Sequence, residues 1–229
     1  MRQRPTMREH SSPLSQFDRD RLQIVVTGFG PFLNHSYNPS WGVAGACAAE
    51  LEAHFSVRAV EIPVTHRRAE QFAKSLDWGG GQIFGLHFGL AAERRYVSLE
   101  RYAHNRRGST PDASGLEPKI DTFGPRIDMC PGRSLDPEGP LARQTLVGVD
   151  ELARRFVDVE VDVRVSRDVG EYVCNTLYYH VLAGVDRARQ ACAAAEALFV
   201  HIPSFSPAQA TSFGKDFARR FCAHLEAHR

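Results

Sequence analysis

The stretch Leu22-Gln-Ile-Val-Val-Thr-Gly-Phe-Gly-Pro-Phe32 begins with a short apolar run and ends in a glycine- and proline-containing turn. An apolar run of this length, bounded by glycine, is typical of a strand buried on both faces. Asn38-Pro-Ser40 follows and supplies the residue types that begin a helix, so we expect a helix from about Ser40. This strand, turn and helix predict an α/β architecture.

The alternation of strand and helix patterns continues along the chain. Apolar runs predict strands at 57–64, 82–90, 157–165 and 197–202, and helical periodicity predicts helices at 66–77, 141–156, 170–193 and from 207 onward. Residues 157–165 alternate between valine and charged residues, which indicates an edge strand with one wet face. Together these elements predict an α/β fold, a three-layer αβα sandwich with a mixed central sheet.

The composition is that of an ordinary globular protein, with 229 residues, 43% hydrophobic and 24% charged. A formal net charge of +1 gives no global field for nucleic acid or an anionic membrane, so neither is expected as a partner. No apolar run approaches the roughly 20 residues of a membrane span. Residues 1–20 are polar and without periodicity, so we expect a disordered N-terminal extension followed by a single domain at 21–229.

The cysteines are odd in number and widely spaced, and they include no Cys-x-x-Cys pair. This pattern argues against a disulfide framework and against a structural zinc site. Reduced thiols in a cytoplasmic protein fit the pattern. The five residues are Cys47, Cys130, Cys174, Cys192 and Cys222.

One of these thiols lies where a predicted strand meets a predicted helix, in the stretch Ser166-Arg-Asp-Val-Gly-Glu-Tyr-Val-Cys-Asn175. The N-terminus of a helix favours a thiolate, so Cys174 is a candidate for a lowered pKa. If the helix begins at Gly170, the thiol lies in the first turn. If Asp168 and Glu171 form a capping box, it lies in the second turn, where the dipole helps less. A small apolar core residue is the alternative interpretation.

Other reactive side chains also follow predicted strands. In open α/β sheets such positions converge on one edge, so Cys174, His201 and Glu100 can meet there. A thiol, an imidazole and a carboxylate are sufficient for covalent acyl transfer. The constellation is weak by itself because ten histidines and 27 acidic residues offer many accidental trios. His201 can equally be a core histidine, and His87 is a rival base in a comparable strand.

Seven short blocks of sequence occur in order over about residues 22–205. They are Thr27–Phe32, Asn38–Trp41, Ile62–Val64, Gly89 with Arg94, Leu99–Asn105, Ser166–Asn175 and Val200–Pro203. In this order they resemble the pyroglutamyl peptidase I (pyrrolidone carboxyl peptidase) family of cysteine peptidases. The resemblance implies a phosphorylase/hydrolase-like sandwich and an exopeptidase that removes N-terminal pyroglutamate from peptides through a thioester acyl-enzyme.

The resemblance also implies roles for individual residues. Cys174 would be the nucleophile, His201 the general base and then acid, and Glu100 the third member. A flat, neutral lactam suits an aromatic and apolar slot with a few polar groups. That slot would be lined by Phe29, Phe32, Tyr172 and Val173, with Asn38 and Arg94 as polar supports. No metal or organic cofactor is required, and a homo-oligomer is among the expectations because relatives are often oligomeric.

The sequence departs from the family pattern next to Gly89. Many bacterial members carry Gly-Gln-Ala-Gly-Gly-Arg, whereas this chain has Leu90 and Glu93 in place of the Gln and the second Gly of the pair. These changes leave the trio intact and bear on specificity. Two alternatives therefore stay open. One is a homologue that acts on a different small lactam or amide, and the other is a non-catalytic pyroglutamyl-binding protein.

Two further segments have separate interpretations. Residues 105–140 form a long Gly/Pro-rich stretch that predicts hidden short strands, a lid or interface arms. His224-Leu-Glu-Ala-His228 places two histidines one helical turn apart but lacks the zinc-peptidase order. We interpret that pair as surface residues.

Overall fold

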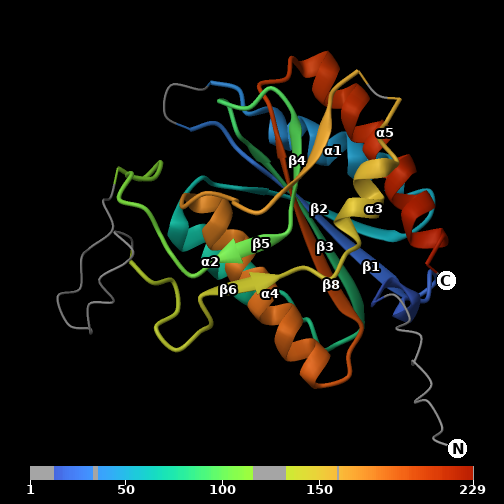
Figure 1. The fold of residues 1–229 in the computed structure, drawn as a ribbon, viewed down its shortest axis with the longest axis horizontal. Coiled ribbons are helices and arrows are strands. Elements are labelled where there is room, and N and C mark those ends of the chain that lie inside the picture. Colours follow the sequence, from blue (N-terminus) through green and yellow to red (C-terminus); the bar gives the residue numbers. More distant parts are fainter. Residues whose placement is uncertain (1–12, 33–35, 116–132, 159, 229) are drawn as a thin grey trace, which may run out of the picture.

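The computed structural model describes residues 13–32, 36–115, 133–158 and 160–228. At its centre is a six-stranded sheet with the strand order β2-β1-β3-β8-β4-β7 (Figure 1). In chain order these strands are β1 (Leu22–Phe29), β2 (Ser56–Ile62), β3 (Gln82–Leu90), β4 (Val97–Glu100), β7 (Val163–Ser166) and β8 (Ala195–Ile202). The first four of the spatial order are parallel, β4 runs antiparallel to β8, and β7 is parallel to β4. The predicted mixed sheet is confirmed.

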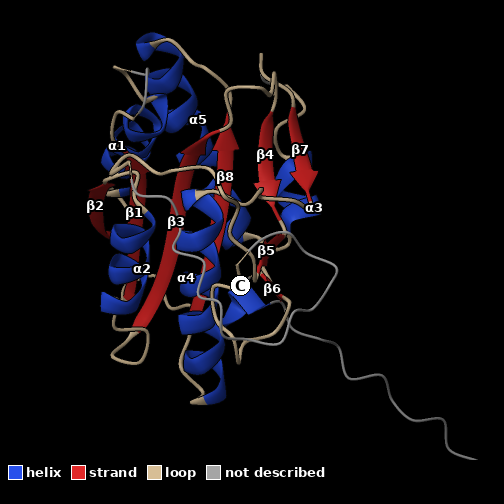
Figure 2. Ribbon diagram, turned by 90° about the vertical axis from the view of Figure 1, so that its left-hand side faces the viewer, coloured by secondary structure: helices blue, strands red, loops and turns tan. Residues whose placement is uncertain are grey.

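Helices cover both faces of this sheet and complete a three-layer αβα sandwich (Figure 2). One apolar cluster joins the sheet to α1 (Pro39–Leu51), α3 (Val149–Arg154) and α5 (Pro207–Glu226). A second cluster joins the other face to α2 (His66–Ser75) and α4 (Val173–Gln190). A 3-10 helix, η1 (Pro13–Gln16), and a two-stranded sheet of β5 (Tyr102–His104) and β6 (Ala142–Gln144) lie outside these layers. The predicted sandwich is therefore confirmed.

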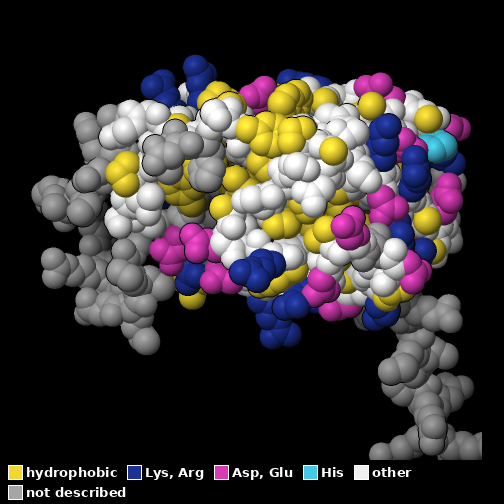
Figure 3. All heavy atoms as spheres, turned by 90° about the horizontal axis from the view of Figure 1, so that it is seen from above, with side chains coloured by type: hydrophobic (Ala, Val, Ile, Leu, Met, Phe, Trp, Pro, Cys, Tyr) yellow, Lys and Arg dark blue, Asp and Glu magenta, His cyan; other side chains and the backbone are white. Residues whose placement is uncertain are grey.

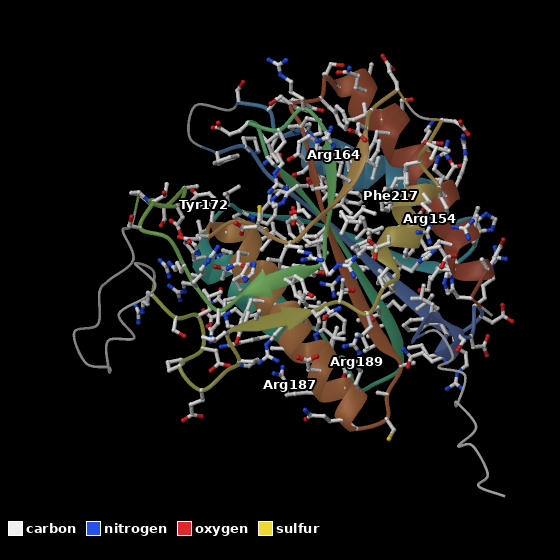
Figure 4. The ribbon with its side chains drawn as sticks, viewed as in Figure 1. Arg154, Arg164, Tyr172, Arg187, Arg189 and Phe217 are labelled. Carbon is white, nitrogen blue, oxygen red and sulfur yellow. The ribbon has the colours of Figure 1, made fainter. Side chains whose placement is uncertain are left out.

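The face under α1 and α5 is packed with phenylalanine. Phe217 and Phe221 lie four residues apart on α5, so they fall on one side of that helix. Their rings meet Phe88 at 5.3 Å and Phe84 at 4.9 Å in edge-to-face contacts. Burial of a large aromatic side chain removes roughly 150–250 Å² of surface from water, so these rings contribute strongly to the hydrophobic stabilisation of this face. In Figure 4, Phe217 of α5 and Arg154 of α3 mark the helices on this side of the sheet.

Several predicted elements differ from the observed ones. The expected helix at 141–156 is strand β6 followed by the short helix α3. The expected edge strand at 157–165 is at the sheet edge but spans only Val163–Ser166, and Val157 is 76% exposed instead of facing a core. Period-two alternation identified the edge position but not where pairing with β4 begins. The short strands β4 and β5 were not anticipated.

The expected disordered extension at 1–20 falls partly outside the described residues. Its described part, from residue 13, contains η1, and Leu14 and Phe17 are buried in the cluster beneath α5. The structure thus corrects the expectation for these two side chains, because they contribute to the core. The central part of the Gly/Pro-rich segment, residues 116–132, also lies outside the described residues. In the described parts of the segment on either side, Arg107 and Arg133 form an isolated antiparallel bridge.

No helix within the described ranges is long and apolar enough to cross a membrane. Seen from above, the face at the carboxyl ends of the parallel strands has hydrophobic side chains near its middle, with basic and acidic side chains interspersed around them (Figure 3). That distribution agrees with a chain whose formal net charge is only +1.

Candidate active site

His201 and Glu100 are paired across two neighbouring strands. The Nδ1 atom of His201 lies 2.9 Å from Oε1 of Glu100. In the antiparallel pairing of β4 with β8, Ser98 is opposite His201 and Glu100 is opposite Phe199. The carboxylate is therefore a diagonal neighbour of the imidazole on one face of the sheet. Both side chains are almost fully buried, at 4% and 0% exposed.

Gly89 leaves the space that the Cys174 thiol fills. A Cβ atom added to Gly89 would lie 2.9 Å from Cys174 Sγ and 2.8 Å from the ring of Phe199. Gly89 is also the β-ladder partner of His201 in the pairing of β3 with β8. The thiol consequently lies over the strand position next to the imidazole. The structure brings Cys174, His201 and Glu100 to one face of the sheet, under the start of α4.

Helix α4 begins so that Cys174 lies in its first turn. The helix starts at Val173, and its N-cap residue Tyr172 makes no side-chain capping bond. Asp168 instead accepts a hydrogen bond from the Gly170 amide at 3.0 Å, in a turn before the helix. The capping box is therefore absent, and the thiol lies among first-turn N–H groups that have no acceptor within the helix.

The expectation that this position lowers the thiol pKa is wrong for the resting protein. Burial is the main cause that raises the pKa of Cys174 to about 12, and the negative charge of Glu100 adds to it. The backbone N–H of Cys174 and the charge of Arg94 act in the opposite direction but are weaker. At neutral pH the residue is thus a thiol, and it needs a base to become a nucleophile.

Glu100 is held from several sides but is not fully bonded. Arg94 Nη1 lies 2.6 Å from the same Oε1 that contacts His201, and Arg94 Nη2 donates to the carbonyl of Asp168 at 2.9 Å. The Tyr178 hydroxyl donates to the Glu100 carbonyl at 2.9 Å. Glu100 Oε2 has no hydrogen-bond partner in the described part of the chain. Arg94, expected to support the ligand, therefore contacts the carboxylate and a backbone carbonyl.

The rival histidine has a different environment. His87 Nδ1 lies 2.8 Å from the hydroxyl of Thr27, so its partner is neutral. Burial lowers the pKa of His87 to about 3, and the side chain is 0% exposed. His201 is paired with a carboxylate that can steady an imidazolium, and His87 Nδ1 is not. The geometry favours His201 as the base.

Two of the expected pocket aromatics meet at the start of α4. The rings of Phe32 and Tyr172 are 6.3 Å apart, and His66 meets Tyr172 edge-to-face at 5.7 Å. The Tyr172 hydroxyl donates to the Pro111 carbonyl at 3.0 Å, which holds the ring in place. Figure 4 labels the Tyr172 side chain. Phe29 and Val173 are almost fully buried, at 2% and 0%, and pack beneath this aromatic group.

Asn38 acts within the loop that joins β1 to α1. Its Oδ1 accepts from the Ser40 amide at 3.1 Å and caps the helix, and its Nδ2 donates to the Gly30 carbonyl at 3.0 Å. The helix approaches β1 so closely that a Cβ on Gly28 would lie 2.5 Å from the Ser40 carbonyl oxygen. Asn38 thus positions the loop that carries Phe32.

Comparison with known proteins identifies the family of the chain. A profile of the pyroglutamyl peptidase family matches residues 22–216. The chain belongs to that family.

Individual relatives cover most of the chain. Pyroglutamyl-peptidase 1 of Rattus norvegicus is 28% identical, with 86% of this chain and 87% of the relative covered. Pyrrolidone-carboxylate peptidase of Bacillus cytotoxicus is 29% identical, with 82% and 80% covered. The crystal structure of pyroglutamyl peptidase I from Bacillus amyloliquefaciens matches at a TM-score of 0.70 and 23% identity, covering 90% of this chain and 98% of that one. That structure confirms the fold.

Within this pyroglutamyl peptidase fold, sequence reasoning missed two supporting residues. The Asn175 amide donates to the carbonyls of His104 and Arg106, at 2.8 and 2.7 Å, and its oxygen accepts from the His104 amide. Asn175 therefore ties the segment after Glu100 to the helix that carries Cys174. Ser98 is buried opposite His201, and its hydroxyl has no partner among the described residues. Ser98 lies two residues before Glu100, and alternate residues of a strand share one face, so the sequence did indicate that the two side chains lie together.

The two departures from the family pattern lie at the edge of the site. Leu90 is the last residue of β3, half-buried, and pairs with Ile202. Glu93 is exposed in the turn that follows. Neither replaces a residue of the trio.

One group of side chains among those described could hold a metal ion, and it lies elsewhere. It consists of Glu151, His224 and His228, on the α3 and α5 side of the sheet. The interpretation of both histidines as surface residues is wrong for His224, which is 0% exposed. The sequence pattern does not show this, because His224 is covered by the start of α3, where it lies against Gly148.

Proposed function

We propose that this chain is a cysteine exopeptidase that hydrolyses the amide bond after an N-terminal pyroglutamyl residue of a peptide, through a thioester acyl-enzyme. The observation that carries the proposal is the buried Glu100–His201 pair beside Gly89, over which the Cys174 sulfur lies. Membership of the pyroglutamyl peptidase family supports it. Binding a lactam requires neither a thiol nor an imidazole–carboxylate pair, so a purely binding role leaves this constellation without a purpose.

His201 is assigned as the base that activates the thiol. An ionised carboxylate can only accept hydrogen bonds, so Glu100 fixes the proton of His201 on Nδ1, 2.9 Å away. The Nε2 lone pair is then free to take the proton of Cys174 as sulfur attacks the carbonyl carbon. Because the thiol pKa is raised to about 12 in the resting protein, the nucleophile forms during the attack and is not stored as a thiolate.

The remaining steps return the proton and release both products. The carbonyl oxygen becomes an oxyanion as the carbon–sulfur bond forms, and we assign its stabilisation to the first-turn N–H groups at Val173 and Cys174. Collapse breaks the carbon–nitrogen bond, and His201 gives its proton to the leaving amine. Water, deprotonated by His201, then cleaves the thioester and regenerates the thiol.

The pyroglutamyl ring is assigned to the aromatic group at the start of α4. The rings of Phe32 and Tyr172 lie 6.3 Å apart and are tilted by 36°, so together they form an aromatic wall beside the helix turn that carries the thiol. Asn38 is assigned to positioning the β1–α1 loop, and Arg94 to holding Glu100. These two residues therefore act on the substrate through others.

The test uses hydrolysis of a pyroglutamyl fluorogenic amide. Wild-type protein is expected to cleave it, and Cys174→Ala is expected to lose about 10⁴-fold or more of kcat/KM. Cys192→Ala is the matched control. Cys192 is exposed just past the other end of α4, about 27 Å along an 18-residue helix, so its removal leaves activity unchanged.

Other outcomes distinguish the alternatives. Binding of pyroglutamate by wild type without cleavage would overturn the proposal in favour of a binding protein. Cleavage of other small lactam amides, but not of the pyroglutamyl amide, would retain the acyl-transfer chemistry and reject the substrate. Retained cleavage in Cys174→Ala would reject the thiol as nucleophile.

Two further expectations belong with this proposal. A cysteine peptidase needs a reduced thiol, so we place its activity in the cytoplasm, and the described cysteines are all unpaired. A homo-oligomer remains a prediction. Sedimentation velocity of the full chain tests it, and the exposed side chain of Leu141, 81% accessible, is a reasonable place for a contact between copies.

A further inference from the structure

A second group of reactive side chains lies on the opposite side of the sheet from Cys174. Glu151 comes from the first turn of α3, His224 from the last turn of α5, and His228 from the turn that directly follows α5. One ligand atom from each lies within 4.8 Å of the others. We propose that Glu151, His224 and His228 form a binding site for a divalent transition-metal ion, for which Zn²⁺ is the best-fitting ion.

His224 is the residue most in need of an explanation. It is 0% exposed, and neither ring nitrogen has a hydrogen-bond partner among the described residues. Buried polar atoms are nearly always bonded, so a histidine with both nitrogens unbonded points to a missing partner. A metal ion would supply that partner to one nitrogen. The His224 ring lies against Gly148 and close to Glu151, so the missing partner would lie inside the protein and not in solvent.

His228 is already oriented as a metal ligand would be. Its Nδ1 donates to the His224 carbonyl at 2.8 Å, which leaves Nε2 as the atom that faces Glu151 Oε2, 2.9 Å away. A backbone carbonyl on the second ring nitrogen is the usual support for a histidine that binds a metal. Two lone pairs cannot face each other at this distance. Either a proton on Nε2 or a cation must lie between them.

The spacing of the donors suits a small tetrahedral ion. Ligands about 2.1 Å from a tetrahedral ion are about 3.4 Å apart. The present separations, 2.9 Å between His228 Nε2 and Glu151 Oε2 and no more than 4.8 Å within the set, are close to that value. His228 lies in the turn that follows α5, where its ring bonds the His224 carbonyl, and the negative end of the α5 dipole favours a cation there. Arg155 Nη2 contacts the other oxygen of Glu151 at 3.5 Å, which leaves Oε2 for the ion.

The chemistry of the set selects the class of ion. Two imidazoles and one carboxylate suit Zn²⁺, whereas Mg²⁺ and Ca²⁺ prefer all-oxygen sites. Three protein ligands leave one position for water. Because the ligands come from α3 and from the end of α5, a bound ion would fasten the C-terminal helix to the neighbouring helix. Binding would then stabilise the folded protein by mass action.

The experiment titrates EDTA-treated full-length protein with ZnCl₂ in a calorimeter and measures Tm with and without the ion. A thiol also binds Zn²⁺, so every variant carries Cys174→Ala to remove the site under α4. We expect one bound Zn²⁺ per chain and a rise in Tm of about 5 °C or more at a free concentration 100 times Kd. Glu151→Gln and His228→Gln are expected to weaken binding at least tenfold and to abolish the rise.

The exposed His54→Gln is the control, and it is expected to retain both binding and the shift. Using Glu151 and His228 avoids substituting the buried His224, whose variants can fail to fold. Co²⁺ gives a second readout, because a nitrogen and oxygen site lacks the thiolate charge-transfer absorption. Unchanged Zn²⁺ affinity in both variants would overturn the proposal. An absence of Zn²⁺ binding in the Cys174→Ala protein would also overturn it. The contact between His228 and Glu151 would then be a hydrogen bond from a protonated Nε2.

Discussion

Glu100 at the end of β4 and Glu196 near the start of β8 are both fully buried carboxylates, and each is paired with one arginine. Glu196 uses both oxygens, accepting from Arg189, the Thr145 hydroxyl and the backbone amides of Leu146 and Ala197. In Glu100, Oε1 accepts from both Arg94 and His201, whereas Oε2 has no hydrogen-bond partner among the described residues.

The difference separates two uses of a buried charge. A carboxylate whose oxygens are all bonded to fixed groups stabilises the fold and has nothing left to offer a reaction. A carboxylate that shares one oxygen with an imidazole can respond when that imidazole gains a proton. The same residue type, buried to the same extent on neighbouring strands, is thus structural in one place and available for chemistry in the other.

The largest expected effect comes from Glu100→Gln. The amide cannot stabilise an imidazolium and can hold His201 in the wrong tautomer, so kcat is expected to fall on the order of 10³- to 10⁴-fold. Hydrolysis of the pyroglutamyl amide under substrate saturation measures it. A fall of less than tenfold would remove Glu100 from the proposed mechanism and erase the contrast with Glu196.

Glu196→Gln is the matched substitution at the structural carboxylate. It removes the buried negative charge that Arg189 contacts and leaves Asp186 as the other carboxylate beside that guanidinium, so the free energy of unfolding is expected to fall by about 2–3 kcal/mol. Activity per folded molecule is expected to stay within about tenfold of wild type. Urea unfolding and the peptidase assay on the same preparation measure the two quantities. A large loss of kcat without loss of stability would break the comparison.

His87 offers the strictest challenge, because it is also incompletely bonded and yet lies outside the trio. Its Nε2 has no partner in the described part of the chain. Burial lowers its pKa to about 3 in the folded protein, against about 6.5 when unfolded. Its contribution to stability is therefore complete above pH 6.5 and is lost as the pH falls, at about 1.4 kcal/mol per pH unit.

The variant His87→Gln is expected to remove that dependence. The slope of unfolding free energy between pH 6.5 and 4 would become shallower by the same amount, whereas the exposed His54→Gln would keep the wild-type slope. Denaturant titrations across this range provide the measurement. If His87→Gln instead changed the pH profile of kcat alone, His87 would rejoin the candidates for the base.

The smallest expected effect concerns the hydrogen bond between Tyr178 and the backbone carbonyl of Glu100. Tyr178→Phe removes the hydrogen bond to the Glu100 carbonyl, which is expected to cost about 1 kcal/mol of stability and several-fold in kcat. Tyr179→Phe is the neighbouring control, since its hydroxyl bonds the Pro140 carbonyl instead. Both side chains are fully buried, so equal losses of kcat would show a general packing effect.

Much of this arrangement was predictable because its signals are local. The apolar run at 82–90 gave β3 with its observed bounds, and Asn38 caps α1 as its residue type predicts. The short blocks around Cys174, His201 and Glu100 pointed to residues that the structure does bring to one face. Each signal depends on a few neighbouring residues, which is why one sequence was enough.

The remainder depends on contacts between distant parts of the chain. Strand β4 is only four residues long, and its antiparallel direction is set by pairing with β8, about a hundred residues later. The thiol pKa depends on what covers Cys174, and the partner of Arg94 depends on where Glu100 lies. The burial of His224 depends on α3. None of these has a local sequence pattern.

The strand order carries a consequence for how the molecule is made. Strand β8 is the last strand of the chain, yet it lies between β3 and β4. Until residues 195–202 have left the ribosome, β4 and β7 have no partner that joins them to the other strands, and the imidazole and carboxylate have not met. The insertion of β8 between β3 and β4 is expected to be a slow step of folding, because it pairs segments that are far apart in the sequence. Peptidase activity is therefore expected only from a chain that has completed this sheet, and a nascent chain or a chain truncated before β8 is expected to be inactive.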